Sequence, residues 1–367
     1  MKNVFRPFAF SCMLFMTAVC LRHAQSFYVE PSYTSFHFYE KLTHGLPIKY
    51  IVIGDSIGRG SGSETSDKKW YKQMEKKVFR QYGASMKGDY VVQSGATAFE
   101  GLFKLQKKQP DNSVDVVFIC FGENDRKYMK AHAFSLLYES LLRKAASLYP
   151  RAEIITFTES SLPNQEFAEA IEKISRHYNA SNIDMRAAFQ HSGMTVHELT
   201  KDNVHPNGSG YEVYANTIME RLKQHIQKHK KIAELKPPIH ENSDMEFDVV
   251  AEFSEQKGFE LEQNYLVSNK KGSYVEFQFY GSILGIKLLR SPDGGMFNVF
   301  IDGKFYTTMS TWWPFEKERY LYITSGLTND LHTVRFEVTG EKSRYNVTNA
   351  SVIRLSSIIM SKKIENK

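Results

Sequence analysis

The chain contains 367 residues, which is too long for one ordinary domain and predicts two. With 42% hydrophobic and 13% aromatic residues, it has ample material for packed cores. The net charge of +6 is modest and spread along the chain, and no run of Lys and Arg interleaved with aromatic residues predicts a nucleic-acid groove. We therefore expect no nucleic-acid partner.

Residues 1–25 have the pattern of an export signal. Lys2 and Arg6 form a positive region before the apolar stretch 7–21, which is short for a membrane span of about 20 residues. A retained N-terminal anchor is the main alternative to cleavage near residues 24–26. We expect a secreted or extracytoplasmic protein. A membrane anchor at the N-terminus, and association with the cell envelope through the leader or the C-terminal domain, stay open.

Only three cysteines occur in the chain. Cys12 and Cys20 lie in the predicted leader, so Cys120 is the single thiol of a mature chain and no internal disulfide can form. Because Cys120 lies in an apolar run, we interpret it as a small core residue rather than a nucleophile.

Between residues 46 and 229, short apolar runs alternate with longer amphipathic stretches. Continuous apolar strands that alternate with helices predict a parallel sheet covered by helices on both faces. The expected strands are 48–53, 89–93, 115–121, 153–158 and, as a weaker signal, 182–189. The expected helices lie near 67–82, 98–107, 131–148, 165–179 and 209–229.

The segment 230–244 carries charges and the pair Pro237-Pro238 but no long apolar period. Proline removes an amide donor and disfavours helix in the residue before it, so we interpret this segment as a linker. From residue 245 to 362 the helical period is absent, and short strands separated by turn residues predict a β-sandwich. The expected strands are 247–253, 273–280, 282–289, 296–301, 304–309, 319–324, 331–338 and 350–360.

Two turn signals and a tryptophan pair mark the predicted sandwich. Residues 291–295, Ser-Pro-Asp-Gly-Gly, and the dipeptide Asp302-Gly303 predict hairpins. On a strand, Trp312 and Trp313 would point to opposite faces, so only one of them can belong to the core. An exposed ring there could stack on a sugar, and packing against the other domain is the alternative.

Four short polar clusters follow predicted strands or loops in the first domain, where the carboxyl ends of parallel strands gather ligand sites. They are Gly54-Asp55-Ser56-Ile57, Ser94-Gly95-Ala96-Thr97, Gly122-Glu123-Asn124-Asp125 and Asp202-Asn203-Val204-His205. Each cluster alone is a weak signal, because Asp, Ser, Asn and Gly are ordinary turn residues. Together, in this order, they resemble the SGNH (GDSL-type) hydrolases, a family of serine esterases.

The resemblance covers residues 46–229 and implies a flavodoxin-like three-layer α/β/α domain with a parallel sheet. The region from Gly272 to Val338 is similar to the jelly-roll accessory modules found beside some carbohydrate-active esterases. We therefore expect a catalytic domain, a linker and a jelly-roll-like accessory sandwich that supplies no catalytic group.

Ester hydrolysis requires an activated hydroxyl, a base and donors for the oxyanion. Ser56 is the candidate nucleophile, His205 the base, and Asp202 the carboxylate that orients the imidazole. The i, i+3 spacing of Asp202 and His205 predicts a side-chain contact, with the other ring nitrogen facing Ser56. The resemblance implies an oxyanion hole made by the Ser56 amide, the Gly95 amide and the Asn124 side chain.

Other motifs are absent. No Gly-x-Ser-x-Gly elbow occurs, and the glycine-rich stretch 58–63 lacks the features of a P-loop or a dinucleotide fingerprint. The twelve histidines show no metal-ligand spacing, so we expect neither a metal nor a cofactor.

We expect an exported serine esterase that removes O-acetyl groups from a cell-envelope or extracellular polysaccharide through an acyl-enzyme. A lipid or acyl-thioester hydrolase and a sugar O-acyltransferase are the enzymatic alternatives. From another class, a carbohydrate-binding protein on an inactive hydrolase fold stays open. Export and the predicted sandwich indicate the substrate only by analogy of fold.

Overall fold

A computed structural model describes residues 36–362 of the chain. The predicted leader at 1–25, with Cys12 and Cys20, lies outside the described residues. In the range that is described, no helix is long and apolar enough to cross a membrane.

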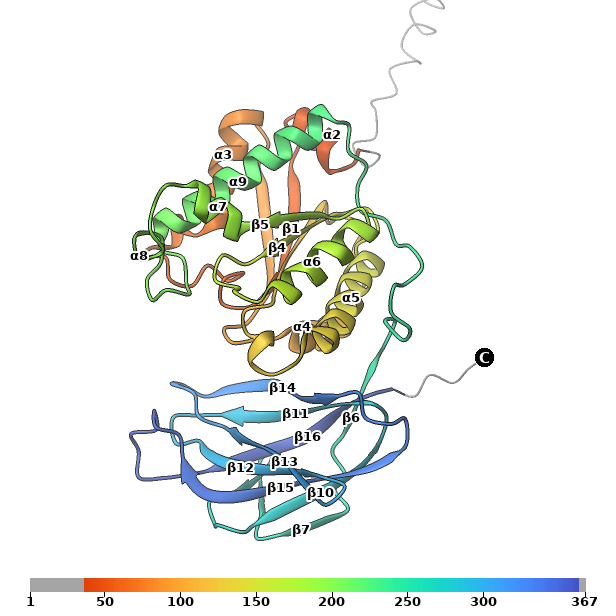
Figure 1. Ribbon diagram of the computed structural model, residues 1–367, viewed down its shortest axis with the longest axis vertical. Coiled ribbons are helices and arrows are strands. Elements are labelled where there is room, and N and C mark those ends of the chain that lie inside the picture. Colours follow the sequence, from red (N-terminus) through yellow and green to blue (C-terminus); the bar gives the residue numbers. More distant parts are fainter. Residues whose placement is uncertain (1–35, 363–367) are drawn as a thin grey trace, which may run out of the picture. The chain divides into compact units, whose positions relative to one another are not determined.

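The first part of the chain forms a five-stranded sheet in the order β2-β1-β3-β4-β5, and every neighbouring pair is parallel (Figure 1). The strands are β1 (Ile48–Gly54), β2 (Met86–Val92), β3 (Val116–Cys120), β4 (Glu153–Thr158) and β5 (Ser181–Asp184). This is the flavodoxin-like order. The chain first adds β2 on one side of β1 and then adds β3, β4 and β5 on the other side, so the strand order changes direction between β1 and β3. The flavodoxin-like prediction is confirmed.

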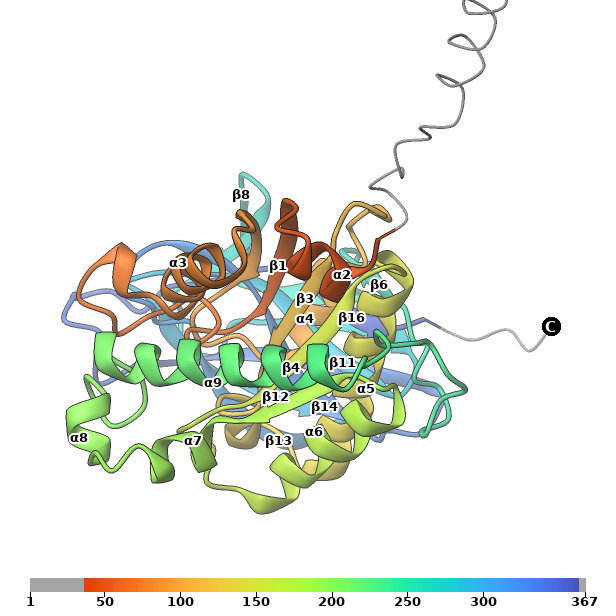
Figure 2. The same cartoon turned by 90° about the horizontal axis from the view of Figure 1, so that it is seen from above.

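Helices cover both faces of this sheet (Figure 2). One apolar cluster packs α2 (Phe38–Thr43), α3 (Trp70–Tyr82), α7 (Met185–His191) and α9 (Gly208–Gln227) against the strands. The other packs α4 (Ala98–Leu105), α5 (Ala131–Leu148) and α6 (Gln165–His177). Shorter elements complete this part: η2 (Ser66–Lys68), η3 (Asp125–Lys127) and α8 (Val196–Leu199).

The fifth predicted strand, 182–189, is partly wrong. The strand ends at Asp184, and helix α7 begins at Met185. Asp184 caps this helix, since its side chain accepts a hydrogen bond from the backbone amide of Arg186 at 3.0 Å. An N-terminal cap of this kind ends an apolar strand within one residue, which the apolar period alone does not reveal.

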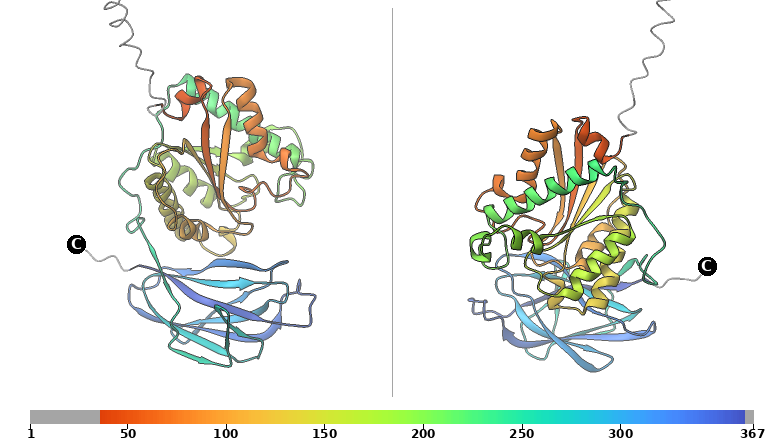
Figure 3. Two further views of the ribbon diagram at one scale, coloured as in Figure 1. Left: turned by 180° about the vertical axis from the view of Figure 1, so that it is seen from behind. Right: turned by 45° about the horizontal axis from the view of Figure 1, so that its top comes forward.

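The C-terminal part is a β-sandwich of two antiparallel sheets (Figure 3). One sheet has the order β13-β12-β15-β10-β7, and the other has β14-β11-β16-β9-β8 with β6 also paired to β16. Inward-facing residues of both sheets form one apolar core. The strands are β6 (Phe247–Val250), β7 (Glu255–Lys257), β8 (Glu260–Glu262), β9 (Tyr265–Ser268), β10 (Tyr274–Tyr280), β11 (Ile283–Arg290), β12 (Gly295–Ile301), β13 (Lys304–Ser310), β14 (Lys317–Ser325), β15 (Leu331–Lys342) and β16 (Ile353–Ser361).

The two hairpin predictions have different outcomes. Asp302 and Gly303 both have positive φ, 50° and 73°, and join the paired strands β12 and β13 as a two-residue hairpin. The hairpin at 291–295 is wrong, because β11 and β12 belong to different sheets. Arg354 holds this crossing in place through two hydrogen bonds of 2.9 Å to the Asp293 carboxylate.

The predicted linker contains no helix or strand, but it is tied to the first part of the chain. The buried Glu139 carboxylate on α5 accepts from the amides of Ile239 and His240 at 2.7 and 2.9 Å. Arg143, also on α5, donates twice to Asp244 at 2.7 and 2.6 Å. We therefore describe 230–244 as a strap held by hydrogen bonds.

The apolar cluster around α4 continues into the sandwich. Phe99 and Phe103 on α4 lie against Phe247 and against Tyr320 and Tyr322 on β14. A β-carbon on Gly285 would lie 2.3 Å from the ring of Phe99, so a residue without a side chain is required there. The α4 face and β14 thus share one continuous packed core.

Candidate active site

Ser56 lies two residues after the end of β1, in a turn organised by its neighbour Asp55. The buried Asp55 carboxylate accepts from the amide of Ile57 at 2.8 Å. The turn closes through the Arg59 amide, which donates to the Asp55 carbonyl at 3.0 Å. Ser56 itself is only 6% exposed. The strand end therefore holds its hydroxyl in a fixed, largely buried place.

The loop 200–206 presents Asp202 and His205 to this serine. His205 Nδ1 lies 2.8 Å from Asp202 Oδ2, and His205 Nε2 lies 2.9 Å from Ser56 Oγ. The other carboxylate oxygen of Asp202 accepts from the backbone amides of His205 at 2.8 Å and Val204 at 3.1 Å. The contact expected from the i, i+3 spacing is present, and it forms an uninterrupted chain of hydrogen bonds to Ser56.

The loop keeps Asp202 ionised. Partial burial alone would raise the pKa of Asp202, but the hydrogen bonds from the His205 amide and ring outweigh it and lower the pKa below its usual value. An ionised carboxylate accepts from Nδ1–H, which leaves the Nε2 lone pair directed at the Ser56 hydroxyl. This is the tautomer that a general base at His205 needs.

Backbone amides and one side chain surround Ser56. Gly95 follows β2 with a φ of +72°, a left-handed conformation that favours glycine. Among the described residues, no hydrogen bond occupies the amide N–H of Ser56 or of Gly95. Asn124 Nδ2 donates to Asp55 Oδ2 at 2.6 Å, and an amide nitrogen carries a second hydrogen. All three groups are therefore able to donate to a developing oxyanion.

Residues 52–213 match the sequence profile of the GDSL-like Lipase/Acylhydrolase family. The α/β domain belongs to this family. The chain is therefore an esterase or acylhydrolase, and the prediction of an enzyme of this family is confirmed. No curated protein is similar enough in sequence to count as a relative.

Two similar solved structures contain both parts of the chain. A two-domain esterase (CEX) active on acetylated mannans, co-crystallized with mannopentaose, has a TM-score of 0.67 at 18% identity, over 88% of this chain and 94% of that one. The same kind of esterase without the sugar has a TM-score of 0.66 at 17% identity, over 89% and 94%. At these identities the similarity establishes a shared two-domain fold.

Three fully buried acids, Asp55, Asp125 and Glu159, lie close to Ser56 in this GDSL-family domain. Glu159 was not identified from the sequence. Asp125 accepts from the amides of Ala98 and Gly122 at 2.7 and 3.1 Å. Glu159, which follows β4, accepts from the Glu123 amide at 2.7 Å. The signal that would have identified Glu159 is its place at the carboxyl end of a strand, the same signal that marks Ser56 and Asn124.

Burial governs the charge of these acids. It raises the pKa of Asp55 to about 6 and of Asp125 to about 7, and it raises the pKa of Glu159 well above its usual value. The charge of Asp55 raises the pKa of Glu159 further, because two carboxylates this close cannot both ionise. We therefore describe a partly protonated floor, defined as Asp55, Asp125 and Glu159.

The floor also brings three potential cation ligands together. One ligand atom each from Asp55, Cys120 and Glu159 lies within 4.8 Å of the others. Burial raises the pKa of the Cys120 thiol well above its usual value, and its Sγ donates to Glu159 at 3.4 Å. Cation binding needs deprotonated ligands, so this environment disfavours it. As predicted, Cys120 is a buried core residue.

The tryptophan pair lies between two strands, as the expected strand bounds leave it, so the alternation of faces along a strand does not apply to it. Both residues lie between the end of β13 at Ser310 and the start of β14 at Lys317, and both are half-buried. Trp312 packs against Tyr345 with 5.1 Å between ring centres. Trp313 approaches Gly95, where a β-carbon would lie 3.4 Å from the ring atom Cη2. A side chain from the sandwich thus lies beside a candidate oxyanion donor.

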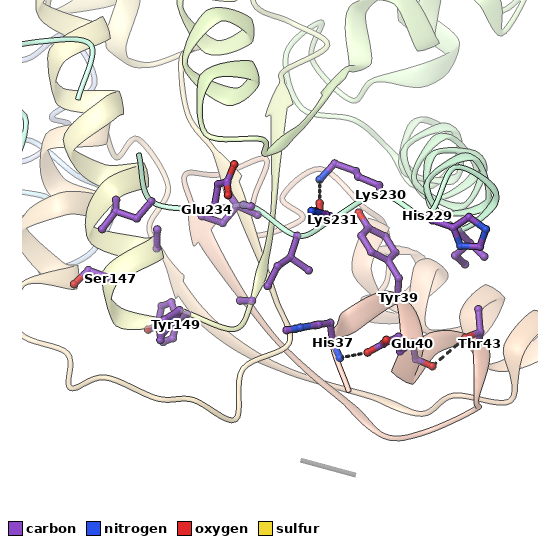
Figure 4. Close-up of a pocket in the computed structure, with 18 residues that line it drawn as sticks. His37, Tyr39, Glu40, Thr43, Ser147, Tyr149, His229, Lys230, Lys231 and Glu234 are labelled. Carbon is purple, nitrogen blue, oxygen red and sulfur yellow. Dashed lines mark hydrogen bonds between the residues drawn. The ribbon is translucent and has the colours of Figure 1, made fainter. Parts of the chain in front are cut away.

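Two cavities differ in their relation to this site. A cavity of about 1030 Å³ between α2 and the strap contains none of the predicted site residues; Tyr39, Tyr149 and Lys230 are among those lining it (Figure 4). A cavity of about 800 Å³ includes Thr200 and Asn203 of the loop that carries His205. The second cavity therefore borders the loop that carries His205, whereas the first reaches none of the predicted site residues.

Proposed function

We propose that the chain is an exported serine esterase that removes O-acetyl groups from carbohydrate, with Ser56, His205 and Asp202 as its catalytic triad. The observation that carries this proposal is the chain of hydrogen bonds from Asp202 through His205 to Ser56, with distances of 2.8 and 2.9 Å. In this chain Asp202 is the acceptor that orients the imidazole, His205 is the base, and Ser56 is the nucleophile.

In the first half-reaction, Ser56 Oγ attacks the ester carbonyl carbon while His205 Nε2 takes the hydroxyl proton. Asp202 stabilises the imidazolium that forms. The carbonyl oxygen becomes an oxyanion that accepts from the Ser56 amide, the Gly95 amide and Asn124 Nδ2. His205 then gives its proton to the departing sugar oxygen, and the acyl-enzyme remains.

In the second half-reaction, water takes the place of the sugar hydroxyl. His205 removes one proton from this water, whose oxygen attacks the acyl carbon, and the same oxyanion donors serve again. Collapse of the intermediate releases acetate, and His205 returns the proton to Ser56. The floor acids do not touch the reacting atoms in this scheme.

Three observations support an acetylated carbohydrate as the substrate. The two-domain fold is shared with an esterase that is active on acetylated mannans. The C-terminal sandwich presents Trp312, Tyr345 and other half-exposed aromatic rings, which bury the CH-rich faces of sugars well. The pattern at residues 1–25 favours export to where polysaccharides occur.

The proposal is tested with the full mature chain on a chain-length series of 4-nitrophenyl esters and, separately, on acetylated polysaccharide. We expect the highest kcat/KM at the acetyl ester and release of free acetate from the polymer. A preference for long acyl chains would indicate a lipid hydrolase instead. Transfer of acetyl to an added sugar without free acetate would indicate an acyltransferase.

A further inference from the structure

Arg319 is a buried arginine that the sandwich places inside the first domain's core. It lies on β14 and is 0% exposed. Its Nε and Nη2 donate to Glu100 Oε2 at 3.1 and 2.8 Å, and Glu100, on the first turn of α4, is 1% exposed. Removing two charges from water is costly, so a pair of this kind is weak evidence of stabilisation and invites a second role.

The same guanidinium makes one further hydrogen bond. Arg319 Nη2 donates to the backbone carbonyl of Gly95 at 2.9 Å. The Gly95 amide N–H, like that of Ser56, makes no hydrogen bond among the described residues. Its φ is +72°, and the Ala96 amide closes the turn by donating to the Gln93 carbonyl at 2.9 Å. Both contacts hold the same peptide unit, Gly95–Ala96: Arg319 binds its carbonyl, and its amide closes the turn.

Trp313 covers the same glycine. The Arg319 guanidinium carbon lies 5.2 Å from the centre of the Trp313 ring, a cation–π arrangement. A β-carbon at Gly95 would meet Trp313 at 3.4 Å and Arg319 Nη1 at 3.7 Å. Gly95 is therefore enclosed by two side chains of the sandwich, and its peptide units have little freedom to rotate.

We propose that Arg319 is a positioning residue for the oxyanion hole: by holding the carbonyl of the Gly95–Ala96 peptide unit, it fixes the place of Gly95 in the turn and so limits where the adjoining Gly95 amide can lie. The inference rests on the triad and oxyanion hole proposed above. Arg319 touches neither substrate nor the reacting atoms and acts only through Gly95. The sandwich therefore completes the geometry of catalysis, in addition to any part in binding polysaccharide.

The size of the expected effect follows from the precision that oxyanion stabilisation requires. Misplacing a group by 1 Å can cost about 100-fold in rate, and losing one oxyanion donor costs about 100- to 1000-fold. We expect Arg319→Ala in the full chain to lower kcat on 4-nitrophenyl acetate by about 10- to 100-fold. KM should change by less than about threefold, because the ground-state ester does not yet carry the charge.

Two further measurements separate positioning from general damage. Methylboronic acid forms a tetrahedral adduct with an active-site serine, and its inhibition constant should rise by the factor that kcat/KM falls. Added guanidinium ion should restore part of the turnover of Arg319→Ala, since it fits the space that the side chain leaves. Arg319→Lys keeps a cation but loses the planar fork, so it should fall between wild type and Arg319→Ala.

Arg143→Ala is the matched control. Arg143 is 7% exposed and pairs with Asp244, on the strap, but makes no contact with Gly95. It should lose stability while keeping kcat within about threefold of wild type. An equal loss of kcat in Arg143→Ala would mean that destabilisation explains the result, and the inference would fail.

The outcomes also distinguish this inference from the proposed function. Folded Arg319→Ala or Arg319→Lys with wild-type kcat and boronate affinity overturns the positioning role, even if Ser56→Ala is inactive. If Arg319→Ala does not fold, Arg319→Lys and its boronate affinity decide the question. Turnover by folded Ser56→Ala would instead overturn the triad itself.

Discussion

Two parts of the site place carboxylates in opposite environments. One is the floor, and the other is the rim, which we define as Asp202 and His205 on the loop 200–206. At the rim, the side chain of Asp202 is 50% exposed, and hydrogen bonds from His205 lower its pKa. On the floor, Asp55 and Asp125 are fully buried, and burial raises their pKa values to about 6 and 7. The difference indicates that exposure and hydrogen bonding suit Asp202 to the role in the chemistry that we propose, and the buried acids to a structural role.

We expect the largest loss of kcat from a substitution of the rim carboxylate, Asp202. In Asp202→Asn the amide oxygen can still accept from the backbone, but the NH₂ would face His205 Nδ1 and favour the tautomer with a proton on Nε2. That nitrogen could no longer accept from Ser56, so kcat should fall by about 10,000-fold. Steady-state kinetics on 4-nitrophenyl acetate measure this fall, and thermal unfolding should change little.

Asp184→Asn is the matched control for this rim variant. Asp184 also lies at the carboxyl end of a strand, where it caps α7 and pairs with Arg186 at 2.7 Å. It should lose some stability and keep its turnover. If Asp202→Asn keeps turnover within about tenfold of wild type, the rim carboxylate does not orient His205.

Asn124 links the rim to the floor, and its replacement should have an intermediate effect. Its Nδ2 donates to the floor residue Asp55 at 2.6 Å and is also the proposed oxyanion donor. Asn124→Ala should lower kcat by about 100- to 1000-fold with little change in KM. Asn346→Ala provides the comparison, since Asn346 is a buried asparagine of the sandwich whose Nδ2 donates to the carbonyls of Gly294 and Ala350 at 3.0 and 2.9 Å. Equal effects of the two variants would exclude a specific role for Asn124.

We expect the smallest change in kcat from substitutions of the floor acids, together with a change in how the free energy of unfolding depends on pH. A carboxyl group whose pKa is raised to about 7 in the folded state, from about 3.9 unfolded, stabilises the fold at low pH. That contribution is lost as the pH rises from about 4 to 7, whereas the lowered pKa of Asp202 has the opposite sign. The two regions should therefore respond to pH in opposite directions.

Asp125→Asn tests this sign. The difference in free energy of unfolding, wild type minus variant, should shrink by up to about 1.4 kcal/mol per pH unit between pH 4 and 7. Denaturant unfolding at pH 5 and pH 7 measures it, and kcat should stay within about tenfold of wild type. A difference that does not change with pH would mean that Asp125 is already ionised at pH 5.

Much of the α/β domain could be predicted because its signals are local. The helix expected at 131–148 has those bounds in the structure, and Ser56, Gly95 and Asn124 each follow a strand whose apolar run is visible in the sequence. Asp202 and His205 could be paired from their spacing alone. The structure brings all five together at one end of the sheet, while their catalytic roles stay a proposal.

What could not be predicted depends on distant contacts. The turn residues at 291–294 join two sheets rather than two paired strands, and Arg354, 61 residues from Asp293, holds that crossing. The edge strands β7 and β8 are exposed along their whole length, so no apolar alternation marks them. Arg319 is separated from Glu100 by 219 residues, and no periodicity connects an arginine on one domain to a glycine turn on another.

The most direct test of the account is chemical labelling of the nucleophile. The full chain is treated with an organophosphonate that reacts with activated serines, and the adduct is mapped by peptide mass spectrometry. We predict one adduct on Ser56, formed in parallel with loss of esterase activity, and no adduct at that rate in Asp202→Asn or Ser56→Ala. Loss of activity with the label on another residue, or full turnover by folded Ser56→Ala, would contradict the proposal that the exposed rim activates Ser56.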